Sequence, residues 1–129
     1  MTIPAPTVSR AVVTLALAAA LATPAAAELR CGWYANPTPG NVILTDADDS
    51  WWLSTQGRPE TPGLWDAYGP DMDAAEWVLT NGNHGYTCAC AEGDFGPAGS
   101  SEAYVIRALR PLPLSRCLAD PALPGPDGQ

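Results

Sequence analysis

The sequence predicts a mainly β fold, either a small antiparallel sheet or a barrel, with one short helix and two disulfides. Fourteen prolines and twelve glycines among 129 residues leave little room for long helices. Short apolar and β-branched segments of strand length alternate with turn-forming residues along the chain. The four cysteines form an even set in a small domain behind a secretion signal, which predicts two disulfide bonds.

Residues 1–27 have the three parts of a cleavable secretory signal peptide. Arg10 precedes about 12 apolar and small residues, and the small triplet Ala25-Ala26-Ala27 follows them. The apolar run is well short of the roughly 20 residues that span a bilayer. Cys31 does not fit a lipid-anchor signal, because Arg30 stands where such a signal needs a small residue. We therefore predict cleavage after the triplet, a periplasmic or secreted location, and no membrane anchor.

Residues 28–124 are expected to form a single β-rich domain with a strong negative charge. All fourteen acidic residues follow the signal, against five arginines and no lysine, so the net charge of the mature chain is near −9. Such a domain is repelled by phosphate backbones and anionic membranes, and it attracts cationic proteins. We therefore predict no nucleic-acid partner. The chain after Asp120 is too rich in proline and glycine to fold, and residues 125–129 are predicted to be a disordered tail.

The cysteines are predicted to form disulfides: Cys31, Cys88, Cys90 and Cys117. On a strand, Cys88 and Cys90 point to the same face, and a bond between them would close a small, strained ring. We therefore expect one of them to bond to Cys31 and the other to Cys117. A zinc site usually leaves two to four residues between paired cysteines, and a redox pair needs C-x-x-C. Neither spacing is present.

The first half of the domain predicts a turn-rich loop followed by a hairpin. Residues 36–41 contain two prolines, a glycine and two asparagines. Val42–Thr45 and Ser50–Ser54 are apolar or aromatic segments of strand length, joined by the acidic turn Asp46–Asp49. Residues 57–70 have no clean period and are expected to form an irregular surface loop.

The second half predicts the helix and two more strands. Asp71–Thr80 is the expected helix, with an aspartate to cap its start and Asn81-Gly82 to end it. Tyr86–Ala91 reads as a buried strand and Ala103–Leu109 as its partner. Residues 92–101 form a glycine-rich connection between them.

Candidate catalytic chemistry is sparse. His84 is the sole histidine of the sequence, so no two-histidine metal site can form, and its turn-rich surroundings favour a solvent-facing turn residue. The cysteines are expected to be oxidised and are therefore not nucleophiles. Carboxylates for glycan hydrolysis are available at Asp66, Asp71, Asp73 and Glu76, but no spacing singles out a pair. These observations leave enzyme activity open but favour a protein that is not an enzyme, with no catalytic residue assigned and no cofactor.

The acidic turn resembles the start of a calcium loop only in part. Asp46-Ala47-Asp48-Asp49-Ser50 places oxygen-bearing side chains at alternate positions. An EF-hand loop then needs glycine at its sixth position and glutamate at its twelfth, and these positions hold Trp51 and Gly57. A plain hairpin turn explains the segment better, so we predict no metal site here. A weak calcium site of another kind is the alternative.

Aromatic residues are the remaining candidates for a binding surface. Trp51 and Trp52 are adjacent, so on a strand one faces the core and the other faces outward. An exposed aromatic ring is a natural anchor for a protein partner or a sugar. The candidate binding surface therefore comprises Trp51, Trp52 and Trp65, with use in the core as the alternative.

Several motifs together resemble one known family. They are Cys31-Gly32-Trp33 with Asn36-Pro37-Thr38-Pro39, Thr80-Asn81-Gly82, Cys88-Ala89-Cys90 and Pro113-Leu114-Ser115-Arg116-Cys117. The chain is similar over about residues 31–124 to small exported bacterial proteins that form a domain of unknown function. The resemblance implies a secreted or periplasmic protein with four cysteines. It offers no catalytic residues to transfer.

Two function classes follow from these observations. The first is a non-enzymatic binding module for a protein partner, such as an inhibitor of a cationic cell-wall hydrolase. The export signal, the disulfides, the negative charge and the spare aromatics favour it. The alternative is an envelope glycan-binding protein or a carboxylate-dependent enzyme. A structural protein without a small ligand is a third class.

Overall fold

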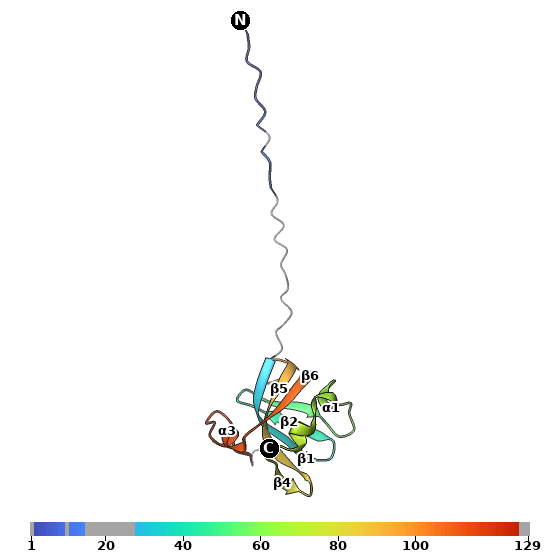
Figure 1. Ribbon diagram of the computed structural model, residues 1–129. Coiled ribbons are helices and arrows are strands. Elements are labelled where there is room, and N and C mark those ends of the chain that lie inside the picture. The colour runs from blue at the N-terminus through green and yellow to red at the C-terminus, as the bar shows by residue number, and fades with distance from the viewer. Residues whose placement is uncertain (1, 10, 15–27, 127–129) are drawn as a thin grey trace.

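Six strands form one sheet in the part of the chain that the computed structural model describes, residues 2–9, 11–14 and 28–126 (Figure 1). The elements are β1 Glu28–Thr38, β2 Asn41–Thr45, β3 Ser50–Ser54, α1 Leu64–Ala67, α2 Pro70–Asp73, β4 Val78–Asn81, β5 His84–Phe95, β6 Ala103–Leu112 and α3 Leu114–Leu118. All pairings between these strands are antiparallel. The mainly β class with two disulfides is confirmed. The predicted cleavage position after Ala27 lies outside the described residues.

The long strand β5 organises the sheet. The strand order is β3-β2-β1-β5, and β5 pairs along its other edge with both β4 and β6. Its first residues pair with β4, where Val78 lies opposite Tyr86. The rest pairs with β6, from Cys88 opposite Leu112 onward. As a result β4 and the start of β5 project as a short hairpin at one end of the sheet (Figure 1).

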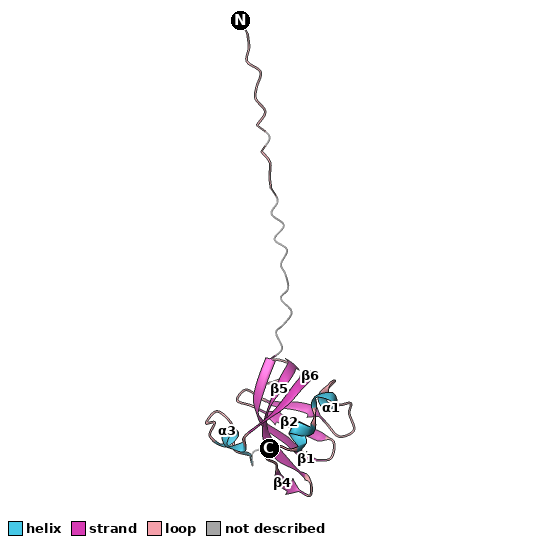
Figure 2. Ribbon diagram, in the orientation of Figure 1, coloured by secondary structure: helices cyan, strands magenta, loops and turns pink. Residues whose placement is uncertain are grey.

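The sheet curls until its two edges approach each other. The backbone N–H of Trp52 in β3 donates to the carbonyl of Ser101, just before β6, at 3.0 Å. The remaining gap is filled by the loop after β3. In this loop the Thr61 N–H donates to Leu53 O at 2.8 Å, and the Ile106 N–H donates to Pro62 O at 2.9 Å. Figure 2 shows the curved strands with the short helices at their margins.

The core lies inside this curl. Its largest fully buried members are Tyr34, Leu44, Trp51, Leu53, Leu64, Met72 and Ile106. A second, smaller cluster covers the opposite face of β1 and β5, where Trp33 packs with Cys88 and Cys117. Trp33 and Tyr34 are neighbours in β1, so they point to opposite faces and anchor one cluster each. The aromatic residues therefore fill much of the interior.

Both disulfides cross between elements and follow the expected pattern. Cys31 in β1 bonds to Cys90, its direct partner in β5, with 4.0 Å between the Cα atoms. Cys88 bonds to Cys117 and ties α3 to β5, with 5.8 Å between the Cα atoms. The sequence left open which of the two central cysteines bonds to which partner.

The predicted helix over Asp71–Thr80 is wrong for most of its length. Only Pro70–Asp73 is helical, and Val78–Asn81 is strand β4. The physical reason is the pair Asn81-Gly82, with Gly82 at φ +59°, which makes a hairpin turn into β5 rather than ending a helix. The expected irregular loop over residues 57–70 also contains the short helix α1.

Two other segments are more ordered than the sequence indicated. Half of the predicted entry loop belongs to β1, which continues to Thr38 before the turn at Gly40. After Asp120, the side chain of Leu123 packs against the Trp33 cluster, and the Trp33 indole donates to Pro124 O at 2.9 Å. The prediction that this segment does not fold is therefore wrong up to Pro124. Of the predicted disordered tail, residues 127–129 lie outside the described part.

Candidate functional site

A groove of about 930 Å³ lies where β3 approaches the start of β6. Three segments line it: Trp52 in β3, residues 55–62 of the following loop, and residues 100–104. These segments are far apart in sequence, and the closure of the sheet brings them together.

Two aromatic side chains are exposed in this groove. Trp52 is 43% exposed and Tyr104 is 51% exposed. Trp51, the neighbour of Trp52, is fully buried in the core, so its assignment to the candidate binding surface was wrong. The alternation along β3 accounts for the difference, since Trp51 faces inward and Trp52 faces outward.

The polar lining of the groove carries both signs of charge. Arg58 and Glu60 come from the loop, and Glu102 comes from the segment before β6. The hydroxyl of Tyr104 donates to Oε2 of Glu102 at 3.0 Å. This hydrogen bond raises the pKa of the Tyr104 hydroxyl, so the phenol stays neutral and holds the carboxylate beside the ring.

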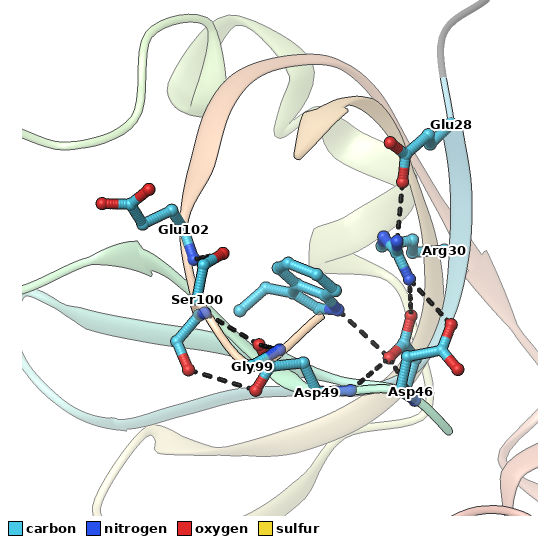
Figure 3. A network of polar contacts seen from close by, with 10 residues as sticks. Glu28, Arg30, Asp46, Asp49, Gly99, Ser100 and Glu102 are labelled. Atoms are coloured by element: carbon cyan, nitrogen blue, oxygen red, sulfur yellow. Dashed lines mark hydrogen bonds and ion pairs between the residues drawn. The ribbon is translucent and has the colours of Figure 1, made fainter. Parts of the chain in front are cut away.

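Asp49 fixes one wall of the groove. Its Oδ2 accepts hydrogen bonds from the backbone N–H groups of Gly99 at 2.9 Å and Ser101 at 2.8 Å, and its Oδ1 accepts from the Ser101 hydroxyl at 3.1 Å (Figure 3). Burial alone would raise the pKa of Asp49, but these donors and the N–H of Ser50 outweigh it and lower the pKa. The turn between β2 and β3 is thereby tied to the loop before β6.

Asp46 holds the turn itself. Its Oδ1 accepts from the N–H groups of Asp48 at 2.9 Å and Asp49 at 3.0 Å, and from the Trp51 indole at 3.1 Å. Its Oδ2 accepts from Arg30 at 3.0 Å (Figure 3). Burial acts to raise the pKa of Asp46, but this set of donors prevails and lowers it.

Arg30 joins the turn to the core. Besides Asp46, it donates to Asp48 at 3.0 Å and to Glu28 at 2.6 Å, and its guanidinium carbon lies 4.1 Å from the centroid of the Trp51 ring. The carboxylates of the turn are thus bound by protein donors. Among the described residues, no group of three or more His, Cys, Asp or Glu side chains is arranged to hold a metal ion.

Trp65 lies beside the groove rather than in it. It is 49% exposed in α1 and lines a neighbouring hollow of about 220 Å³. Glu60, Thr61 and Pro62 line both hollows. Trp52 and Trp65, two of the three predicted surface tryptophans, therefore border the same short segment.

Comparison with known proteins identifies the family. A family model described as "Protein of unknown function (DUF4087)" matches residues 25–124. The chain belongs to this family. Searches of curated proteins and of solved structures found no significant match. The resemblance drawn from the sequence motifs is thus confirmed at the level of a domain of unknown function.

This DUF4087 protein has its histidine and cysteines outside the groove. His84 is not a solvent-facing turn residue, because it begins β5, is partly buried and lies 2.6 Å through Nδ1 from Asn36 Oδ1. The four cysteines are paired, two by two. No helix in the described ranges is long and apolar enough to cross a membrane.

Sequence reasoning missed Tyr104, Glu60 and Glu102 in this DUF4087 protein. Period-2 alternation in the predicted strand places Tyr104 on the same face as Ile106, which is buried, and the register shift between Val105 and Ala103 leaves Tyr104 exposed instead. The two glutamates carried no signal either. They come together only because the loop after β3 fills the gap to β6.

Proposed function

We propose that this DUF4087 protein is a periplasmic or secreted binding module that takes up a cationic segment of a protein partner in the groove. The observation that carries the proposal is the joint position of Trp52 and Tyr104, both about half exposed, in one groove of about 930 Å³. Tryptophan and tyrosine have large rings with an apolar body and a polar group. At protein interfaces such side chains, seated in a concave surface, contribute much of the binding energy.

The charge of the protein favours a cationic partner. The mature chain carries a net charge near −9, and Glu60 and Glu102 face the groove against the single base Arg58. A surface of this sign accelerates encounter with basic proteins and disfavours acidic ones. A cationic cell-wall hydrolase is therefore the partner that we propose, with inhibition as the consequence of binding.

The disulfides support an exported location. All four cysteines are paired, and disulfides persist in oxidising compartments rather than in the reducing cytoplasm. The leader at residues 1–27 agrees with this compartment. Cell-wall hydrolases act in the same space, so the proposed partner and the protein would meet there.

A direct test mixes the purified domain with a panel of lysozymes of different origin. The proposal expects a complex on size-exclusion chromatography and a loss of lytic activity with at least one of them. Raising the salt concentration should weaken the complex, because part of the attraction is electrostatic. If no lysozyme forms a complex and none loses activity, the proposed partner class is wrong.

Glycan binding is the second candidate, and the pairing of carboxylates with an aromatic ring favours it. Glu60 and Glu102 line the same groove as Trp52, and sugar sites combine aromatic platforms with carboxylates. Isothermal titration with muropeptides tests this candidate. Binding that vanishes in Trp52→Ala would support it, and turnover that vanishes in Glu60→Gln or Glu102→Gln would indicate an enzyme. If the protein binds no cell-wall fragment, both the glycan-binding and the enzymatic proposals are wrong.

A further inference from the structure

A second pocket, of about 420 Å³, lies at the β4 end of the molecule and shares no lining residue with the groove. Tyr68 and Trp77 contribute its aromatic walls, and Asp73 contributes a carboxylate. Asn36 from β1 and Asn83 from the β4–β5 turn complete the polar lining. The volume lies within the range of pockets that bind small molecules or single side chains.

Core contacts fix the positions of the two aromatic walls, Tyr68 and Trp77. The ring of Tyr34, buried in the core, lies 6.4 Å from the ring of Tyr68 and 6.0 Å from that of Trp77, centroid to centroid. The indole N–H of Trp77 also donates to Met72 O at 2.7 Å. Both walls are therefore fixed before any ligand arrives, which lowers the entropic cost of binding.

The charge in this pocket has a single sign. Of its lining residues, Asp73 alone is charged, and residues 59–106 contain no lysine or arginine at all. Burial and then the interaction with Asp73 raise the pKa of the Tyr68 hydroxyl to about 12, so this phenol is neutral and remains a donor toward the carboxylate. No lysine or arginine from this segment competes for Asp73, and the histidine of the segment, His84, contacts Asn36 through Nδ1.

Most hydrogen-bond donors of the lining are already used within the protein. The Asn36 amide donates to Thr38 O at 3.0 Å and to Asn41 O at 2.7 Å, and the Trp77 indole donates to Met72 O. The side-chain oxygen of Asn36 is engaged by His84, whose Nδ1 lies 2.6 Å away, and the Asp73 carboxylate is a further acceptor of the lining. A ligand that brings N–H donors and a positive charge therefore matches this lining, whereas an anion would meet the carboxylate.

We propose that this pocket binds an alkylammonium group of the kind carried by a lysine side chain. The Asp73 carboxylate takes the charge, and the rings of Tyr68 and Trp77 cover the methylene stem and add a cation–π attraction. The site is independent of the groove, so the failure of one assignment leaves the other standing.

The test uses the purified domain and capped lysine, Nα-acetyl-lysine N-methylamide, followed by ¹H–¹⁵N NMR. We expect the indole resonance of Trp77 and the amide resonances of Asn83 to shift, with a dissociation constant on the order of millimolar, as for a small single-site ligand. Capped norleucine has the same stem without the charge and should bind at least about tenfold more weakly.

Two matched variants locate the charge. Asp73→Asn should weaken binding of capped lysine about tenfold. Asp71→Asn changes the net charge equally in the same helix but does not line the pocket, so it should bind like the wild type. Both aspartates are exposed, and the fold should tolerate both changes. Equal binding of capped norleucine, or equal effects of the two variants, would overturn the proposal.

Discussion

The guanidinium carbon of Arg30 lies 4.1 Å from the centroid of the Trp51 ring, while the indole N–H of Trp51 donates to Asp46, the ion-pair partner of Arg30. The three side chains form a closed set. Arg30 covers the core tryptophan and pairs with Asp46 and Asp48 of the acidic turn at the same time. The same turn also contains Asp49, which binds the backbone of Gly99 and Ser101 and so fixes one wall of the groove.

Replacing Arg30 with methionine should destabilise the domain by about 2 to 4 kcal/mol, because three carboxylates would remain together without their cation. The side chain is only 14% exposed, so solvent cannot fully compensate. Urea unfolding followed by tryptophan fluorescence measures the change. Arg107→Met is the control, since its ion pair with Asp94 is exposed and should matter much less. Equal destabilisation by the two variants would contradict the role of Arg30.

Acid should destabilise the protein through Asp46 and Asp49. Both pKa values are lowered from the ordinary 3.8, so the folded state binds fewer protons than the unfolded state in this range. The stabilisation is complete only above about pH 5, where the carboxyls of the unfolded chain are also ionised, and it is lost as the pH falls through the folded pKa values. The free energy of unfolding, measured at several pH values between neutral and acidic, gives the dependence of stability on pH. Asp46→Asn and Asp49→Asn should each weaken this dependence. A dependence that is unchanged in both variants would show that these two carboxylates are not its cause.

Gly63 should be intolerant of any side chain. Its φ is +85°, and a Cβ there would overlap the carbonyl oxygen of Ile106 in β6. Gly63→Ala should cost at least about 2 kcal/mol and loosen the loop that closes the sheet. Gly57→Ala is the matched control, with φ +80° and open space, and should cost about 1 kcal/mol. Thermal unfolding compares them, and equal shifts would show that the contact with β6 is unimportant.

Loss of each of the two disulfides should affect the local stability of a different part of the fold. The chain-entropy model gives about 4 kcal/mol for the Cys31–Cys90 bridge and about 3.5 kcal/mol for Cys88–Cys117. The first joins residues that the sheet already pairs, whereas the second is the covalent link of α3 to β5. Cys88→Ala with Cys117→Ala should therefore increase amide exchange over residues 114–124 selectively. Protection of that segment equal to the wild type would refute this distinction.

The β2–β3 hairpin, the bonding of the four cysteines in two disulfides and the opposite orientations of Trp51 and Trp52 could be predicted because each depends on local pattern. Period-2 alternation required one of Trp51 and Trp52 to face outward. Which one faced outward depended on the pairing register with β2, where Leu44 lies opposite Trp51, and local pattern does not encode that register.

The groove and β4 could not be predicted for a related reason. The four residues of β4 are too short to show a period, and the aspartates before them resemble helix caps. The groove needs Trp52, Glu60 and Tyr104 together, which only the closure of β3 toward β6 provides. Non-local closure of this kind is the part of a β fold that a single sequence reveals least.

The most direct measurement for the proposed function is the affinity of groove variants for the lysozyme that binds the domain best. Isothermal titration would compare the wild type with Trp52→Ala, Tyr104→Ala and the control Leu118→Ala, an exposed residue of α3 that is remote from the groove lining. We predict a loss of affinity of at least about tenfold for each groove variant and none for the control. Groove variants that bind as tightly as the wild type would contradict the assignment.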